Sequence, residues 1–148
     1  MHFKKVCIDG LGYHLPDNIV TSEEIENRLA PLYDLLKLSQ GRLELMSGIQ
    51  ERRFWDKGVL PSEVATIAGE KAITQSGVNP EHIGCLISAS VCRDFLEPST
   101  ASIIHNNLKL PVEALVFDVS NACLGVLNGM SIIASMIEQN QILAGLVV

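Results

Sequence analysis

One cysteine, Cys123, stands where a strand pattern gives way to a helix pattern. Across Leu115–Ser120 the apolar side chains fall on alternate positions, which predicts a strand with one apolar face. From Cys123 to Ile137 the apolar residues recur at steps of three and four, which predicts a helix. Ser120 and Asn121 lie beside the turn, and either is a suitable N-cap for that helix.

A thiol at such a joint lies near the unpaired amide N–H groups of a helix start and near the positive end of the helix dipole. Both favour the thiolate over the thiol, so the setting activates a nucleophile. The alternative is that Cys123 is a small buried apolar side chain, which is the commoner role of a single cysteine in apolar sequence. The local pattern therefore predicts a site without naming a reaction.

Composition and charge narrow the class of protein. The 148 residues suit one domain, and a hydrophobic content of 47% with few aromatics predicts an aliphatic core. The net charge of −6 does not favour nucleic acid or an anionic membrane as a partner. No apolar run is long enough to span a bilayer, and no secretory signal is present. The four cysteines have no metal-site spacing, so we expect reduced thiols in a cytoplasmic protein without a metal or a resident cofactor.

Strand and helix patterns alternate along the chain, which predicts an α/β fold with a buried, mostly parallel sheet covered by helices. Thr21 and Glu24 form a capping-box pattern at the first helix, and Pro31 should kink or break that helix. Ser62 is the expected cap of the second helix. Cys7 and Cys85 fall in apolar strands, so their expected role is structural. The expected strands are 4–11, 83–91, 115–120 and 142–148, and the expected helices are 22–36, 62–76, 99–108 and the one from 123.

The chain closes on the apolar strand 142–148, with no helix after it to cover the sheet. We therefore expect an incomplete domain, which is either part of a longer chain or a subunit completed by another polypeptide. Two adjacent arginines, Arg52 and Arg53, follow the turn at Gly48 and could bind the phosphates of a nucleotide-bearing substrate. The alternative is that they are solvated charges beside packed aromatic residues.

Four stretches of the sequence carry a resemblance to a known family. KKVCIDGLGYHLP, GIQERR, LISASV and FDVSNACLGVLNGM resemble the N-terminal half of the thiolase superfamily, in particular the β-ketoacyl-acyl-carrier-protein synthase III group. The stretch CRDFLEPSTAS, together with the cysteine block, resembles the OleA-type enzymes, which condense two long-chain acyl-CoA molecules without decarboxylation. The resemblance covers essentially the whole chain. It implies that residues 1–148 form an N-terminal thiolase-like half-domain of an acyltransferase that performs a Claisen condensation.

The resemblance also implies roles for two residues. Cys123 corresponds to the nucleophile that holds the acyl group. Glu97 corresponds to the base that removes the α-proton of the second acyl chain, projected into the neighbouring subunit of a homodimer. Glu97 precedes Cys123 by 26 positions, which is the spacing that the OleA resemblance requires. The alternative for Glu97 is a structural one, in which its carboxylate caps the helix that begins near Ser99.

The family completes its site with a histidine and an asparagine from its C-terminal half, and none of the four histidines here corresponds to that histidine. We therefore expect residues 1–148 alone to lack turnover. The tryptophan and arginine that bind the CoA adenine in many synthase III enzymes are replaced by Arg42 and Met46. Either acyl-CoA or acyl-carrier protein could be the acyl donor.

Two other functions stay open. One is a synthase III of fatty acid biosynthesis that condenses with malonyl-acyl-carrier protein and has no need of Glu97 as a base. The other belongs to a different class, a non-catalytic interaction subunit that docks onto a separate C-terminal partner.

Overall fold

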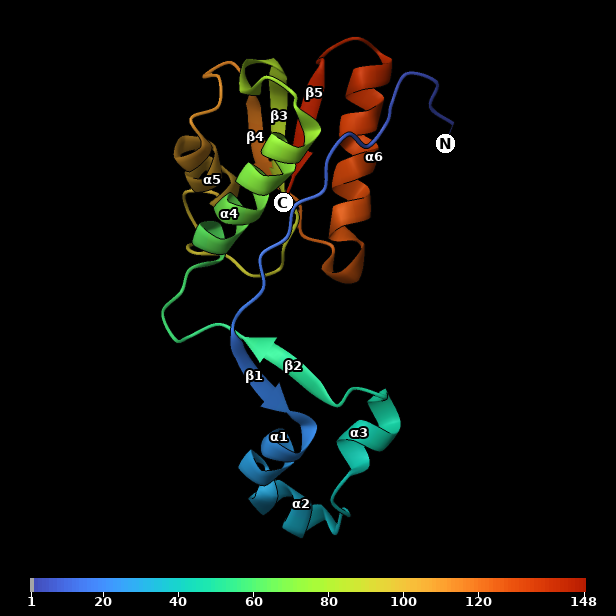
Figure 1. The fold of residues 1–148 in the computed structure, drawn as a ribbon, viewed down its shortest axis with the longest axis vertical. Helices are drawn as coiled ribbons and strands as arrows, with labels where there is room; N and C mark the ends of the chain where they lie inside the picture. Colours follow the sequence, from blue (N-terminus) through green and yellow to red (C-terminus); the bar gives the residue numbers. More distant parts are fainter. Residues whose placement is uncertain (1) are drawn as a thin grey trace. The chain divides into compact units, whose positions relative to one another are not determined.

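The computed structural model describes residues 2–148, which form two compact units. The sheet unit comprises Val59–Val148 together with the N-terminal segment up to His14, and the hairpin unit comprises Leu15–Gly58. Each unit has its own secondary structure and its own buried side chains, so each is described by itself (Figure 1).

The sheet unit is built on three parallel strands in the order β4–β3–β5. The central strand pairs with both neighbours, so that Leu86 lies beside Val116 on one side and Leu146 on the other. Nearly every residue of the central strand is buried, as its continuous apolar sequence predicts for a strand covered on both faces. The strands are β3 (Ile83–Ser88), β4 (Leu115–Asp118) and β5 (Ala144–Val147).

Helices cover both faces of this sheet (Figure 1). On one face Leu86 packs in a cluster with Ile104 of α5, to which α4 also contributes. On the other face Cys85 and Ile87 pack against Ile133 of α6. Burial raises the pKa of the Cys85 thiol, so this cysteine is the structural residue that was expected. The helices are α4 (Pro61–Ser76), α5 (Thr100–Leu108) and α6 (Gly125–Glu138), with 3₁₀ turns η1 (Pro80–His82) and η2 (Ala122–Leu124). The predicted α/β class with a parallel sheet is confirmed.

The predicted strand at 4–11 is wrong, because this segment pairs with no strand among residues 2–148. Its backbone runs along helices instead: the N–H groups of Lys4 and Lys5 donate to the Glu138 carboxylate at 2.9 and 3.0 Å. At Gly12 any Cβ would overlap the carbonyl oxygen of Ala68 in α4. An apolar run indicates burial, but a strand also needs a neighbouring strand to accept its hydrogen bonds. Cys7 is consequently exposed, and not in a buried strand as expected.

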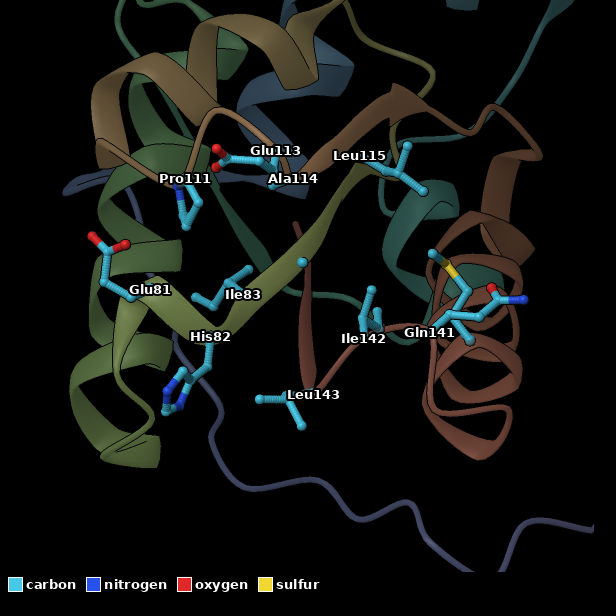
Figure 2. A pocket seen from close by; sticks show the side chains of 12 residues that line it. Glu81, His82, Ile83, Pro111, Glu113, Ala114, Leu115, Gln141, Ile142 and Leu143 are labelled. Carbon is cyan, nitrogen blue, oxygen red and sulfur yellow. The ribbon is translucent and has the colours of Figure 1, made fainter.

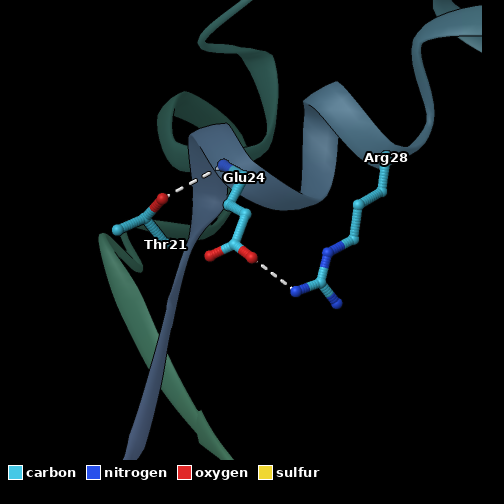
Figure 3. A network of polar contacts seen from close by, with 3 residues as sticks. All are labelled: Thr21, Glu24 and Arg28. Carbon is cyan, nitrogen blue, oxygen red and sulfur yellow. Dashed lines mark hydrogen bonds and ion pairs between the residues drawn. The ribbon is translucent and has the colours of Figure 1, made fainter.

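The hairpin unit pairs two antiparallel strands and carries three short helices. Thr21 ends β1 and caps α1 by accepting a hydrogen bond from the N–H of Glu24 at 3.0 Å (Figure 3). The Glu24 carboxylate does not complete the box and binds Arg28 one turn later at 2.5 Å. Pro31 opens a new helix, so the predicted break is confirmed. The elements are β1 (Asn18–Thr21), β2 (Glu51–Phe54), α1 (Ser22–Arg28), α2 (Ala30–Leu36) and α3 (Arg42–Ser47).

A buried carboxylate organises the hairpin unit. Glu26 is 1% exposed and accepts hydrogen bonds from the N–H groups of Gly41 and Leu43, both at 2.6 Å. The Tyr33 hydroxyl donates to the same carboxylate at 3.0 Å. The N–H groups of Gly41 and Leu43 lie at the N-terminus of α3, where the helix leaves N–H groups unpaired. The N–H groups of Leu43 and Gly41 lower the pKa of Glu26, because they stabilise its ionised form.

Candidate active site

The site predicted from Cys123 lies at the carboxyl edge of the parallel sheet. The N–H of Val119, just after β4, donates to the carbonyl of Ser88 at 2.8 Å. The N–H of Ala89, just after β3, donates to the carbonyl of Val148 at 2.6 Å. These bonds hold the ends of the strands together at the edge where parallel sheets bind their ligands.

Cys123 is exposed and lies in the 3₁₀ turn η2, between β4 and α6. The residue before it, Ala122, has a φ of 41°, which places an alanine in the left-handed region. Such a conformation costs about 1–3 kcal/mol for a residue with a Cβ and is concentrated at functional sites. The turn therefore presents the thiol to solvent on a strained backbone.

The start of the helix differs from the prediction. α6 begins at Gly125 and not at Cys123, and neither Ser120 nor Asn121 caps it with a side chain. The Asn121 amide donates instead to Asn128 at 2.6 Å. The N–H of Leu124 is used within the 3₁₀ turn, where it donates to the carbonyl of Asn121 at 2.9 Å. One of the donors expected near the thiol is thus already paired.

Close packing fixes the position of the cysteine turn over the sheet. A Cβ on Gly125 would lie 3.0 Å from the carbonyl oxygen of Ala89, and one on Gly129 would lie 2.9 Å from Val147. Both contacts are tighter than ordinary van der Waals contact, so a Cβ at either position would require α6 or its neighbours to shift. The glycines therefore keep the first turns of α6, and with them Cys123, against the edge of the sheet.

Glu97 lies on the loop between β3 and α5 and is exposed. Its carboxylate makes no hydrogen bond within residues 2–148. The apolar residues before it are also exposed, Phe95 at 53% and Leu96 at 85%. The structure thus leaves the Glu97 side chain exposed on this loop.

The alternative role of Glu97 as a helix cap is wrong. The Ser99 hydroxyl accepts from the N–H of Ser102 at 3.2 Å, which makes Ser99 the N-cap of α5. The N–H groups of Thr100 and Ala101 donate to the Asp118 carboxylate at 3.0 and 2.8 Å. The Asp118 carboxylate and the Ser99 hydroxyl thus accept from three of the first N–H groups of the helix and leave no capping role for Glu97.

Sequence reasoning missed two carboxylates that hold this region. The alternating pattern places Asp118 in a strand but gives no sign of its partners, because Thr100 and Ala101 lie far from it in sequence. Asp94 accepts from the N–H of Ser62 at 2.9 Å, so it performs the capping at α4 that was predicted for the Ser62 side chain. An aspartate that ends an apolar strand was the available signal for Asp118.

The two arginines lie next to each other in β2 and therefore point to opposite faces of the hairpin. Arg52 donates to the hydroxyl of Ser22 at 3.2 Å, and Arg53 donates to the carbonyl of Pro16 at 3.0 Å. The structure does not bring their guanidinium groups together. Each arginine has a structural contact of its own, so phosphate binding by either one stays a prediction.

Neither His82 nor His105 has a recorded contact with Cys123. The ring of His105 donates to the carbonyl of Pro111 at 2.9 Å, and His82 is exposed in η1.

Among residues 2–148 no group of three or more His, Cys, Asp or Glu side chains could hold a metal ion. No helix in the same range has the length and apolarity needed to cross a bilayer.

A depression of about 520 Å³ lies elsewhere on the sheet unit (Figure 2). Its lining includes Ile83, Leu115 and Leu143, which stand at or just before the amino ends of the three strands. Because the strands are parallel, this is the edge opposite to Cys123. The depression is therefore not the site that contains the thiol.

A parallel sheet covered by helices, with an exposed cysteine on a strained turn at its carboxyl edge, has the architecture of the thiolase-like fold. No protein-family model matches the chain. It is 43% identical over all 148 residues to an acyl-CoA:acyl-CoA alkyltransferase of Shewanella oneidensis, and 45% identical to one of Xanthomonas campestris. The chain spans 42% and 44% of the length of these two relatives.

Solved structures agree with the sequence relatives. A cerulenin-bound OleA of Xanthomonas campestris matches with a TM-score of 0.89 and 45% identity, over 95% of this chain and 41% of that one. A glutamate-to-glutamine variant of the same OleA matches with a TM-score of 0.88. The chain is thus a homologue of the OleA-type acyl-CoA:acyl-CoA alkyltransferases over their N-terminal part, as the sequence resemblance predicted.

Proposed function

We propose that this chain is the N-terminal, nucleophile-bearing part of a transferase that condenses two acyl-CoA molecules without decarboxylation. The observation that carries this proposal is the exposed Cys123 on its strained turn, in a chain whose relatives are acyl-CoA:acyl-CoA alkyltransferases. Long-chain acyl groups are the proposed substrates, and no resident cofactor is required.

The reaction divides into two half-reactions. In the first, the Cys123 thiolate attacks the carbonyl carbon of an acyl-CoA, and CoA leaves as a thiol after taking up a proton. In the second, a base removes a proton from the α-carbon of another acyl-CoA. The resulting carbanion attacks the acyl-cysteine carbonyl, forms the carbon–carbon bond and releases the Cys123 thiolate. The product of the two steps is a 3-oxoacyl thioester.

Glu97 is the proposed base of the second half-reaction. Its carboxylate is exposed on its loop and is not engaged in capping α5. In the Xanthomonas campestris OleA, solved variants replace a glutamate and a cysteine that are 26 positions apart. Glu97 and Cys123 have the same separation. Other solved variants of that protein replace a histidine far beyond the cysteine, outside the part that this chain covers. We therefore expect no turnover from residues 1–148 alone.

A homodimer fits the exposed loop, because Phe95 and Leu96 would be covered by a second copy that receives Glu97. The unpaired state of all four cysteines supports a cytoplasmic enzyme. Arg52 and Arg53 remain the proposed contacts for CoA phosphates, although each would have to bind them beside its present partner.

Assays of the two half-reactions on the complete enzyme test this function. Glu97→Gln should leave acylation of Cys123 within about twofold of wild type and reduce condensation by about 10²-fold or more. Glu113→Gln, an exposed glutamate at the amino edge of the sheet, is the matched control and should change neither rate.

The identity of the second thioester, which supplies the carbanion, distinguishes the proposed function from a decarboxylative synthase and from a non-catalytic subunit. Consumption of malonyl-acyl-carrier protein, with Glu97 dispensable, would replace the proposal by a decarboxylative synthase. Absence of acylation and condensation with every thioester would favour a non-catalytic interaction subunit.

A further inference from the structure

The loop that carries Glu97 is anchored at both of its ends by buried or half-buried polar contacts. At its start, Asp94 accepts from the N–H of Ser62 in α4 at 2.9 Å. At its end, the N–H groups of Thr100 and Ala101 donate to the two oxygens of Asp118. Thr100 and Ala101 are 2% and 0% exposed, so this second anchor is shielded from water. Between the anchors the chain turns outward and is exposed.

Asp118 links the strand that leads to Cys123 with the end of the Glu97 loop. It is the last residue of β4 and stands five positions before Cys123 on the same stretch of backbone. Its bidentate contact holds the helix start that lies three positions after Glu97. One carboxylate thus connects the segment of the proposed nucleophile to the segment of the proposed base.

We infer that Asp118 is a positioning residue for condensation: it holds the root of the Glu97 loop at a fixed place on the strand that leads to Cys123. This inference rests on the function proposed above. It applies whether Glu97 serves its own copy or a second one, because a symmetric dimer fixes the two sheets to each other. Proton removal needs the base held within hydrogen-bond reach of the α-carbon proton, so a loosened root should slow condensation more than acylation.

Asp118→Asn tests the inference, since the amide keeps the size of the side chain but presents one NH₂ group to a backbone N–H and loses one of the two bonds. In the complete enzyme, acylation of Cys123 should stay within about twofold of wild type, and condensation from the acyl-enzyme should slow by about 10- to 100-fold. The ratio of the two rates is the readout that a general loss of stability would not move.

Glu138→Gln is the control for changing a distant carboxylate to an amide. Glu138 accepts two backbone N–H groups, at 2.9 and 3.0 Å, both on Oε2, and lies at the far end of α6, about 20 Å along the helix from Cys123. It should leave the ratio of the two rates unchanged. Thr100→Pro provides a second variant, at the first position of α5, where proline is tolerated. It removes one donor to Asp118 and also the hydroxyl that accepts from the N–H of Asp94 at 3.4 Å, so it loosens both anchors of the loop.

Failure of the inference and failure of the proposed function give different results. If wild type is acylated and Glu97→Gln blocks condensation, but Asp118→Asn and Thr100→Pro fold and condense at the wild-type rate, the positioning role is wrong. It is also wrong if both variants lose the two half-reactions equally, or if neither folds. If wild-type enzyme is not acylated, or condenses normally without the Glu97 carboxylate, the proposed function itself fails.

Discussion

The sheet unit and the hairpin unit bury different kinds of side chain. In the sheet unit the largest fully buried side chains include Leu86, Ile87 and Ile104, which pack between the strands and the helices on either face. In the hairpin unit Glu26 and Ser22 are buried, and many leucines point to solvent, with Leu35 77% exposed and Leu45 86% exposed. The first unit buries mainly aliphatic side chains, whereas the largest buried side chain of the second is a hydrogen-bonded carboxylate, with Val20 its one fully buried aliphatic side chain among the described residues.

The difference matters for the site, because the candidate catalytic residues Cys123 and Glu97 both belong to the sheet unit. A close-packed core resists displacement, so a turn and a loop fixed to such a core keep their places. Hydrogen bonds to a carboxylate depend on its ionisation, so the hairpin unit should respond to pH where a purely apolar core would not. Changes that affect one unit and spare the other test this contrast.

Leu86→Ala should have the largest effect. The side chain is 0% exposed at the centre of β3, so its truncation leaves a cavity and should cost about 2–5 kcal/mol. Hydrogen exchange followed by mass spectrometry should show faster exchange in β3, β4 and β5, with peptides from Leu15–Gly58 unchanged. Leu35→Ala is the control, since its exposed side chain should cost little. An equal loss of protection from hydrogen exchange in both units would contradict the view that the apolar core of the sheet unit stabilises that unit alone.

Much of the sheet unit was predictable from sequence, because a fully buried strand such as 83–88 is apolar at almost every position. The helices that cover the sheet were predictable from their apolar periodicity and from Gly77, which ends α4 in the left-handed conformation that glycine favours. The segment 4–11 was not, because its apolar pattern predicts a buried strand, whereas it pairs with no strand among residues 2–148 and leaves Ile8 64% and Leu11 74% exposed.

The candidate site was predictable only in part. The change of period located Cys123. The left-handed backbone at Ala122 was not predictable, because alanine is not a residue type that indicates a positive φ. Glu26 and Asp118 escaped prediction for a shared reason. Each carboxylate accepts hydrogen bonds from residues 15–18 positions away, and such pairs leave no periodic signal in the sequence.

Glu26→Gln should have the next largest effect, confined to the hairpin unit. The neutral amide cannot accept from the N–H groups of Gly41 and Leu43 as the carboxylate does, so α3 should lose protection from exchange by about an order of magnitude. Glu23→Gln, an exposed neighbour on the same helix, should have no such effect. Loss of protection in β3 as well would show that the two units are not independent.

Low pH should weaken the hydrogen bonds that the N–H groups of Gly41 and Leu43 donate to Glu26. The pKa of Glu26 lies below its ordinary value of 4.5, so the stability that its ionised form supplies is fully present above that value. That stability is lost as the pH falls through the lowered pKa. Exchange in α3, corrected for the intrinsic effect of pH, should therefore accelerate below pH 4.5 in wild type. In Glu26→Gln the rate should no longer depend on pH in this range.

Thr21→Ala should have the smallest effect of the series. It removes the hydroxyl that accepts from the N–H of Glu24 at the start of α1 and should cost about 1 kcal/mol. Thr21→Ser keeps the hydroxyl and should restore most of this loss. Thermal denaturation read by circular dichroism measures both. A cost for Thr21→Ala equal to that of Leu86→Ala would mean that the hairpin unit depends on its helix cap as strongly as the sheet unit depends on its core.

The central claim is that Cys123 is the residue that carries the acyl group. Its most direct test is the intact mass of the complete enzyme after incubation with a long-chain acyl-CoA. Cys92, which is also exposed, provides the control for non-specific thiol reactivity. We predict a gain of one acyl group in wild type and in Cys92→Ala, and none in Cys123→Ala. A gain that persists in Cys123→Ala, or no gain in wild type, would contradict the account.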